Sequence, residues 1–231
     1  MSFWQVTMRR SISLSRTYIV IGIGMSIYGI IISNILALTP ANPASTAIDL
    51  VKIFPILSVA ILSLSALLFS MPVVMLFVYD KNNGVFEYLL STGLDQFDIF
   101  KGYVKASLLL AAGLLAFSSA LNITFGIYLG TSLGLLASIV VLTFSIGISV
   151  VFLVTVSMIA FSSLQKTPTG ANQPLGVVIG IIPVFPTLIL PLVFPLQAIV
   201  IDIIIAAATL LISIALLFSI NRLILREKLL P

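Results

Sequence analysis

Long apolar runs, separated by short polar segments, constrain this chain more than any other feature. From Leu175 to Ile220 only Asp202 is charged. Over the whole chain 60% of the residues are hydrophobic and 8% are charged, with a mean hydropathy of +1.28. So few polar side chains could not cover the apolar surface of a soluble domain. Because helices are the usual way to satisfy the backbone in lipid, the sequence predicts an all-α integral membrane protein.

The apolar runs are long enough for about six transmembrane helices, since a bilayer core of about 30 Å takes roughly 20 apolar residues per helix. We expect the spans at 17–38, 55–78, 103–129, 133–161, 175–190 and 198–220. One membrane domain covering 1–231 is the simplest organisation. The first run is longer than the 7–15 residues of a signal peptide's apolar core, so we interpret it as a retained span.

Small residues and prolines inside these runs predict how the helices pack and where one of them is interrupted. Six small residues are expected to allow close contact between helices, and they are Gly22, Ser26, Gly29, Ser145, Gly147 and Ser149. Four prolines, Pro183, Pro186, Pro191 and Pro195, fall in and after the fifth run. Because proline frees a backbone carbonyl and interrupts a helix, we expect the fifth helix to be broken or kinked.

The segment from Ser2 to Ser15 has an amphipathic pattern. Trp4, Met8 and Ile12 recur in steps of four, and Gln5 and Arg9 follow on an adjacent stripe. This spacing favours a short interfacial helix on the inner membrane surface. A basic tail without helical structure is the alternative.

Basic residues are distributed very unequally between the two sides of this layout. Ten of the eleven Lys and Arg residues fall on one side, and only Lys52 falls on the other. An excess of Lys and Arg marks the cytoplasmic side. Both termini and the segments 79–102 and 162–174 are therefore expected to be cytoplasmic, in a multi-pass protein of the plasma membrane. The same bias explains the net charge of +4, and no basic patch with interleaved aromatic residues indicates a nucleic-acid partner.

Several kinds of chemistry are excluded by residues that the chain lacks. Cysteine and histidine are both absent, which excludes disulfides, zinc sites built on either residue, His-dependent triads and haem held by either ligand. No Gly-Lys dipeptide occurs, so the P-loop pattern that binds ATP phosphates is excluded as well. We expect no catalytic, metal-binding or cofactor-binding residues and no enzymatic activity in this chain.

A charged, turn-rich segment from Tyr79 to Gly93 interrupts the apolar runs between the second and third spans. Its apolar residues follow helical steps of three and four, and they are Val85, Phe86, Leu89 and Leu90. Glu87 and Ser91 share another face. A helix that is too short to span the membrane but has an apolar face must cover something, either the lipid surface or a groove of a soluble partner.

This segment resembles a stretch of the type-2 membrane subunits of ABC transporters, the exporter permeases. After the second span that family has approximately an acidic residue or Asn, then Gly, a small residue, Leu, Glu, any residue, two Leu and Ser or Thr. Here the stretch reads Asn83-Gly84-Val85-Phe86-Glu87-Tyr88-Leu89-Leu90-Ser91-Thr92. The resemblance also covers the N-terminal helix, the six-span layout and the closing Arg-Glu-Lys-Leu-Leu at 226–230. The chain departs from the family with Gly93 in place of a frequent Pro, and with Lys101-Gly102 in place of Gly-Lys.

The resemblance implies a permease subunit of an ATP-driven exporter. Its coupling helix would fit a cleft in a separate ATPase subunit that binds ATP and Mg. The residues at this contact would be Val85, Phe86, Glu87, Leu89, Leu90 and Ser91. Because the family has twelve spans around its pathway, a second permease copy or a homologue would supply the other half, within the lipid bilayer.

Two other functions stay open on the sequence alone, an ATP-independent carrier or channel and a membrane assembly protein. An ion-driven carrier is expected to have charged groups deep in its helices. The candidate polar residues of a pathway are Asn34, Asn122 and Asp202. Helix packing is the preferred interpretation for Asn122. The preferred interpretation for Asp202 is a structural or interfacial role. This residue lies about one turn into the sixth span, within reach of headgroups and water.

Overall fold

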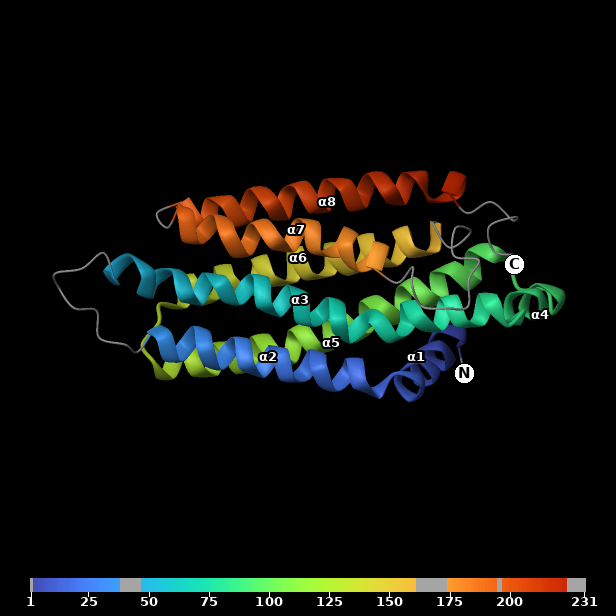
Figure 1. Cartoon of the computed structure of the whole chain (residues 1–231), viewed down its shortest axis with the longest axis horizontal. Helices are drawn as coiled ribbons and strands as arrows, with labels where there is room; N and C mark the ends of the chain where they lie inside the picture. Colours follow the sequence, from blue (N-terminus) through green and yellow to red (C-terminus); the bar gives the residue numbers. More distant parts are fainter. Residues whose placement is uncertain (1, 38–46, 161–173, 195–196, 224–231) are drawn as a thin grey trace.

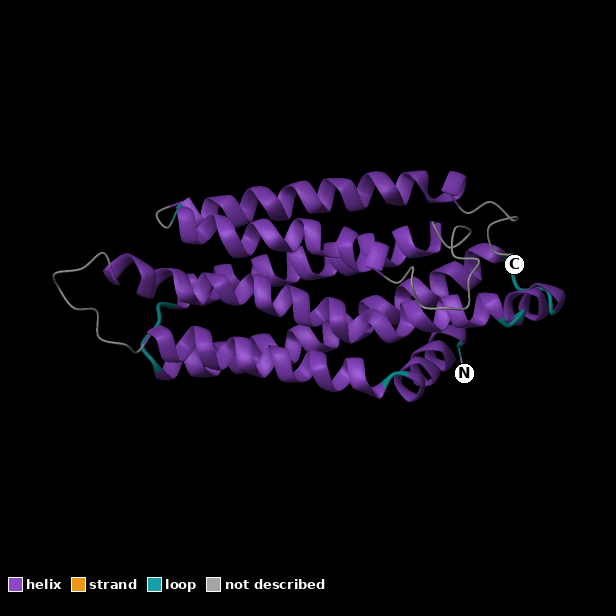
Figure 2. Cartoon of the chain, viewed as in Figure 1, coloured by secondary structure: helices purple, strands orange, loops and turns teal. Residues whose placement is uncertain are grey.

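The computed structural model describes residues 2–37, 47–160, 174–194 and 197–223, and every regular element in these ranges is an α-helix. The helices form an elongated bundle (Figures 1 and 2). Their bounds are α1 Phe3–Leu14, α2 Arg16–Ala37, α3 Ala47–Asn82, α4 Val85–Ser91, α5 Gln96–Tyr128, α6 Leu133–Ala160, α7 Pro174–Val193 and α8 Ala198–Leu223. The prediction of an all-helical chain is confirmed for the described residues.

Four described helices are long and apolar enough to cross a membrane, and they lie in α3, α5, α6 and α8. Helices α1 and α2 form a further apolar pair, bent by 86° between Leu14 and Arg16. The chain is thus a multi-pass membrane protein. The described part of each of the six ranges expected from the sequence lies in one long helix, although α3 begins at Ala47 rather than 55 and α5 at Gln96 rather than 103. The segment 162–173, Pro195 and the closing motif at 226–230 lie outside the described residues.

The fifth helix differs from its expectation. Helix α7 is continuous from Pro174 to Val193 although it contains Pro183, Pro186 and Pro191, so it is not broken as one alternative expected; the other alternative, a kink, stays a prediction. Helix α7 packs against α3, α6 and α8, and the Thr187 hydroxyl donates a hydrogen bond to the Val184 carbonyl at 2.7 Å. Neighbouring helices and hydroxyl side chains of this kind let membrane helices tolerate proline.

Helices α3 and α6 form the centre of the bundle. Helix α3 packs against α2, α5, α6 and α7, and α6 packs against α5, α7 and α8. Two thirds of the apolar windows of α3 and α6 are buried, compared with 22% of that of α8. The central side chains, such as Val59, Leu67, Ile146 and Val150, are at most 1% exposed. The periphery, by contrast, exposes large apolar side chains to the surroundings, as lipid-facing helices do.

A close approach between α2 and α3 depends on glycine, as the small residues of the first span predict. A Cβ atom at Gly22 would lie 3.0 Å from Phe69 Cβ and 3.1 Å from the Ser65 carbonyl oxygen. Gly24, two residues further along the same helix, has open space around its Cα. One face of α2 therefore packs on α3 through glycine, and the position of Gly24 points away from that contact.

We expect Gly22→Val to destabilise the protein by about 1–3 kcal/mol, because a larger side chain must push α2 away from the backbone of α3. Gly24→Val is the matched control and should change stability by no more than about 0.5 kcal/mol. Unfolding in mixed detergent micelles, followed by circular dichroism, measures both variants. Equal effects of the two substitutions would contradict the packing described here.

Candidate functional site

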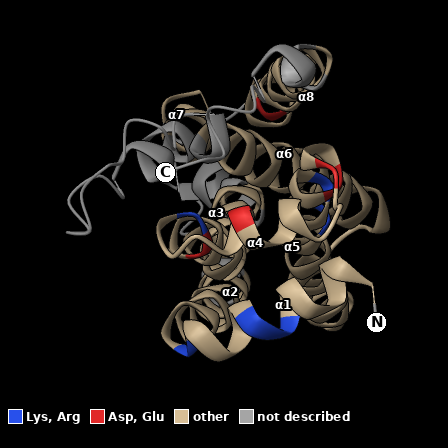
Figure 3. Cartoon of the chain, turned by 90° about the vertical axis from the view of Figure 1, so that its right-hand side faces the viewer, with Lys and Arg blue, Asp and Glu red and all other residues tan. Residues whose placement is uncertain are grey.

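The charged segment between α3 and α5 forms the tip of the bundle. Figure 1 shows α4 beyond the ends of the long helices, with α1 at the same end. Figure 3 looks onto this end and shows charged residues on α1, on α4 and at the start of α5. Helix α4 runs from Val85 to Ser91, the same bounds that the sequence predicts for a coupling helix.

Glycine residues at its two ends set the length of α4. Gly84 has a φ of +69° and Gly93 a φ of +87°, a region that glycine enters without steric cost. The Leu94 amide donates to the Leu89 carbonyl and the Gly93 amide to the Leu90 carbonyl. These two bonds form the Schellman motif that ends many helices. The residue that departs from the family's frequent Pro is thus the one that closes α4.

Phe86 is buried within this chain. It is 1% exposed, and its ring lies 4.9 Å from that of Phe77 on α3 and 5.8 Å from that of Tyr103 on α5, centroid to centroid. The Phe3 ring of α1 contacts Tyr103 at 5.8 Å. The expectation that Phe86 packs into a partner's groove is therefore wrong, because the apolar face of α4 turns toward its own bundle. Phe86 fixes α4 to α3 and α5 instead.

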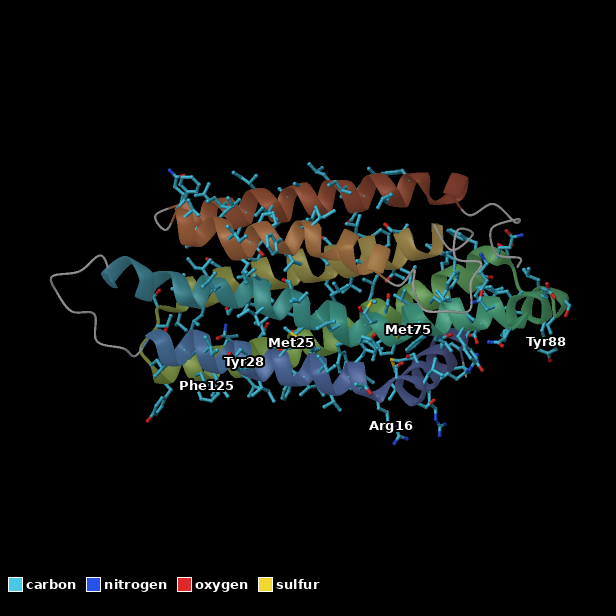
Figure 4. The ribbon with its side chains drawn as sticks, viewed as in Figure 1. Arg16, Met25, Tyr28, Met75, Tyr88 and Phe125 are labelled. Atoms are coloured by element: carbon cyan, nitrogen blue, oxygen red, sulfur yellow. The ribbon has the colours of Figure 1, made fainter. Side chains whose placement is uncertain are left out.

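The outer face of α4 is polar and open. Tyr88 is 68% exposed and projects from the tip of the molecule (Figure 4). Glu87 and Ser91 are exposed beside it. Three further residues of the predicted coupling site, Val85, Leu89 and Leu90, are partly buried, and the two leucines pack against the cluster around Phe86. The exposed surface of α4 is formed by Glu87, Tyr88 and Ser91.

A partly buried ion pair joins α1 to the same site. Asp80 on α3 is 0% exposed, and Arg10 of α1 is 44% exposed. Nη1 and Nη2 of Arg10 donate to Oδ2 and Oδ1 of Asp80 at 3.1 and 2.7 Å, the two-pronged geometry that makes Arg–carboxylate pairs strong. The Tyr103 hydroxyl donates a third bond to Oδ2. Sequence reasoning missed this arrangement, because no local pattern links two residues seventy positions apart.

Asn34 and Asn122 pair with each other between α2 and α5. Nδ2 of Asn34 donates to Oδ1 of Asn122 at 3.0 Å and to the Ile30 carbonyl at 2.8 Å. Ser26 and Ser118 form a second hydrogen bond between these helices. All four polar side chains are buried. The pairs support the interpretation of Asn122 as a packing residue, since polar bonds of this kind hold membrane helices together.

Asp202 lies apart from the two asparagines. Helices α8 and α2 occupy opposite edges of the bundle (Figure 1). Asp202 is 0% exposed, and neither carboxylate oxygen has a hydrogen-bond partner among the described residues. It belongs to the buried stripe of α8, which also contains Ala198, Ala206, Thr209 and Ser213. The expectation that headgroups and water reach Asp202 does not agree with this burial, because the stripe turns toward the bundle.

No group of three or more His, Cys, Asp or Glu residues within the described ranges is placed to hold a metal ion. In comparisons with known proteins, no family model, no curated protein and no solved structure matches this chain. The candidate site is therefore the tip formed by α1, α4 and the adjoining ends of α3 and α5.

We expect Arg10→Gln to lower the free energy of unfolding by about 2–4 kcal/mol, because it leaves the Asp80 carboxylate buried without its charged partner. Arg9→Gln removes the same charge from an exposed neighbour and should cost about 0.5 kcal/mol or less. Detergent titration of both purified variants, followed by circular dichroism, measures the difference. A loss of the same size in both would show that the ion pair contributes nothing.

Proposed function

We propose that this chain is the membrane-spanning permease subunit of an ATP-driven ABC transporter of the exporter type. It would form half of the translocation pathway and would be coupled to a separate ATPase subunit through α4. One observation carries the proposal. A short helix with an open polar face stands at the tip of the bundle, and its opposite face is packed rigidly on two long membrane helices.

The packing of α4 suits the transmission of motion. Phe86, Phe77 and Tyr103 bring α4, α3 and α5 into one aromatic cluster, with centroids 4.9 to 5.8 Å apart. A force applied to Glu87 or Tyr88 on the outer face would therefore displace the ends of α3 and α5. Close-packed interiors transmit such displacements because they have little room to absorb them. The motif from Asn83 to Thr92, which resembles the coupling helix of the permease family, supports the same assignment.

The proposed topology has six spans, formed by α2, α3, α5, α6, α7 and α8. Helix α1 would lie along the cytoplasmic surface of the plasma membrane, as its bend of 86° from α2 favours. Both termini and α4 would be cytoplasmic, in keeping with ten of eleven basic residues on that side. An ATPase in the cytoplasm could then reach α4.

A second permease copy or a homologue is part of the proposal. The described interior is filled by side chains such as Val59, Leu67 and Val150, which are at most 1% exposed. Asn34 and Asn122 are joined to each other and so do not line an open route. A pathway through the interior of one bundle would require these packed helices to separate. A pathway between two bundles would leave the packing of each bundle intact.

A second candidate function, an ATP-independent carrier, is favoured by Asp202. A buried carboxylate without a hydrogen-bond partner in the described part of the chain is costly unless it is protonated or neutralised by a cation. Ionisable residues inside membrane helices often form part of proton or ion routes. In this function Asp202 would take up and release the coupling ion.

We expect Tyr88→Ala to weaken ATPase binding about tenfold, because exposed tyrosines are frequent hot spots of protein interfaces. Tyr128→Ala is the matched control, since Tyr128 is 87% exposed at the opposite end of the bundle and should leave binding unchanged. Co-purification and titration of the ATPase subunit measure the effect. Tyr88 is preferable to Leu89 or Leu90 because those leucines also hold α4 in place.

The outcome separates the two functions. Transport by this chain reconstituted without any nucleotide-binding subunit would overturn the permease proposal and support the carrier. Equal ATPase binding by the Tyr88 and Tyr128 variants would reject α4 as the coupling site.

We expect Asp202→Asn to retain ATP-driven transport and to be at least as stable as the wild-type protein, because the amide has nearly the same shape and avoids an unpaired buried charge. Transport and thermal unfolding in detergent measure both properties. Loss of transport by a well-folded Asp202→Asn variant, together with loss of ion or proton dependence, would favour the carrier.

A further inference from the structure

A cavity of about 770 Å³ lies along the outer side of α5, between this helix, α6 and the end of α8. Lys101 and Lys105 form its charged end. Its apolar lining includes Leu108 and Ala112 of α5, Phe152 of α6 and Phe218 of α8. We refer to this cavity as the lysine groove. It is separate from the contact surface of α4 and from Asp202.

The lysine groove is charged at one end and apolar along its length. From Lys101 to Ala112 helix α5 rises about 16 Å, at 1.5 Å per residue. Half of the hydrocarbon core of a bilayer is about 15 Å thick. The whole groove, with its two lysines included, is thus about as long as one leaflet is thick. The apolar part beyond Lys105 rises about 10 Å along α5, which places the two cations toward the headgroups.

Aromatic contacts support this placement of the lysines. The Lys105 ammonium lies 5.0 Å from the centroid of the Trp4 ring on α1, and the Lys101 ammonium lies 4.1 Å from that of Phe97. Tryptophan prefers the membrane–water interface, and α1 has the pattern of an interfacial helix. Both lysines are exposed, and neither forms an ion pair with a described carboxylate. Their charges are available to a ligand.

We propose that the lysine groove binds one anionic phospholipid from the leaflet on the α4 side of the membrane. The lipid phosphate lies between Lys101 and Lys105, and one acyl chain follows α5 past Leu108 to Ala112. Basic pockets between membrane helices recognise anionic headgroups in this way. The proposal does not depend on the ABC assignment, because it requires only that the chain spans a membrane.

Trp4 is the only tryptophan of the chain and lies beside Lys105, so it reports on the headgroup end of the groove. The protein is reconstituted in phosphatidylcholine containing either brominated phosphatidylglycerol or brominated phosphatidylcholine, which quench tryptophan fluorescence on contact. We expect the anionic lipid to quench Trp4 preferentially. Lys101→Gln with Lys105→Gln should reduce this preference by about fivefold per lysine. Arg9→Gln with Arg16→Gln is the control that removes two exposed charges elsewhere.

A second pair of variants tests the apolar part of the groove. Ala112→Phe places a ring in the path of the acyl chain, and Ala116→Phe places the same ring one turn away, at an exposed position outside the lining. Native mass spectrometry counts the phosphatidylglycerol retained after delipidation, and thermal unfolding confirms that each variant is folded. We expect one lipid on the wild-type protein and on Ala116→Phe, and none on Ala112→Phe.

Three results would overturn the proposal. They are equal quenching of wild-type Trp4 by the two brominated lipids, the same loss of preference in the lysine and arginine variants, and retention of the lipid by Ala112→Phe. If Ala112→Phe instead dissociates a lipid-free dimer, the groove is an interface between two copies of the chain and the lipid site is rejected.

Discussion

A carboxylate that is buried away from water needs hydrogen-bond donors from the protein. At the tip of the bundle this carboxylate is that of Asp80. Its two oxygens accept bonds from Arg10 and Tyr103, so α1 and the start of α5 must both lie against the end of α3. With these three elements in place, Phe77 and Tyr103 leave an apolar site for Phe86. The position of α4 thus depends on an ion pair to which α4 contributes nothing.

Helix α4 could not persist by itself, because isolated helices shorter than about 12–15 residues are marginal in water. Its seven residues are held by the glycine turns at both ends and by burial of Phe86. Glu87 and Tyr88 are exposed and are not part of the cluster that holds α4 in place. The inner face of the helix maintains the fold, and the outer face remains open to contacts beyond the chain.

Much of the fold could be predicted because membrane helices have simple requirements of length and apolarity, and because Gly84 and Gly93 mark the ends of α4. The sequence could not predict the direction in which the apolar face of α4 turns. A partner's groove and the chain's own core both require an apolar side chain at Phe86. The pairing of Arg10 with Asp80 has no local signal. The continuity of α7 depends on neighbouring helices. The burial of Asp202 depends on the rotation of α8 about its axis, and a single charged residue in an apolar run does not determine this rotation.

In the proposed topology, the bend of 86° between α1 and α2 would also fix the depth of the molecule in its membrane. Helix α1 would rest in one interfacial plane, and the Arg10–Asp80 pair would attach the long helices to it. The opposite end has no surface helix between α5 and α6, only the turn around Gly130 and the 87% exposed Tyr128. A thicker or thinner bilayer would therefore be accommodated at that end, by local deformation of the lipid or by tilting of the helices. The tip would keep a constant height above the membrane surface, whatever the lipid composition.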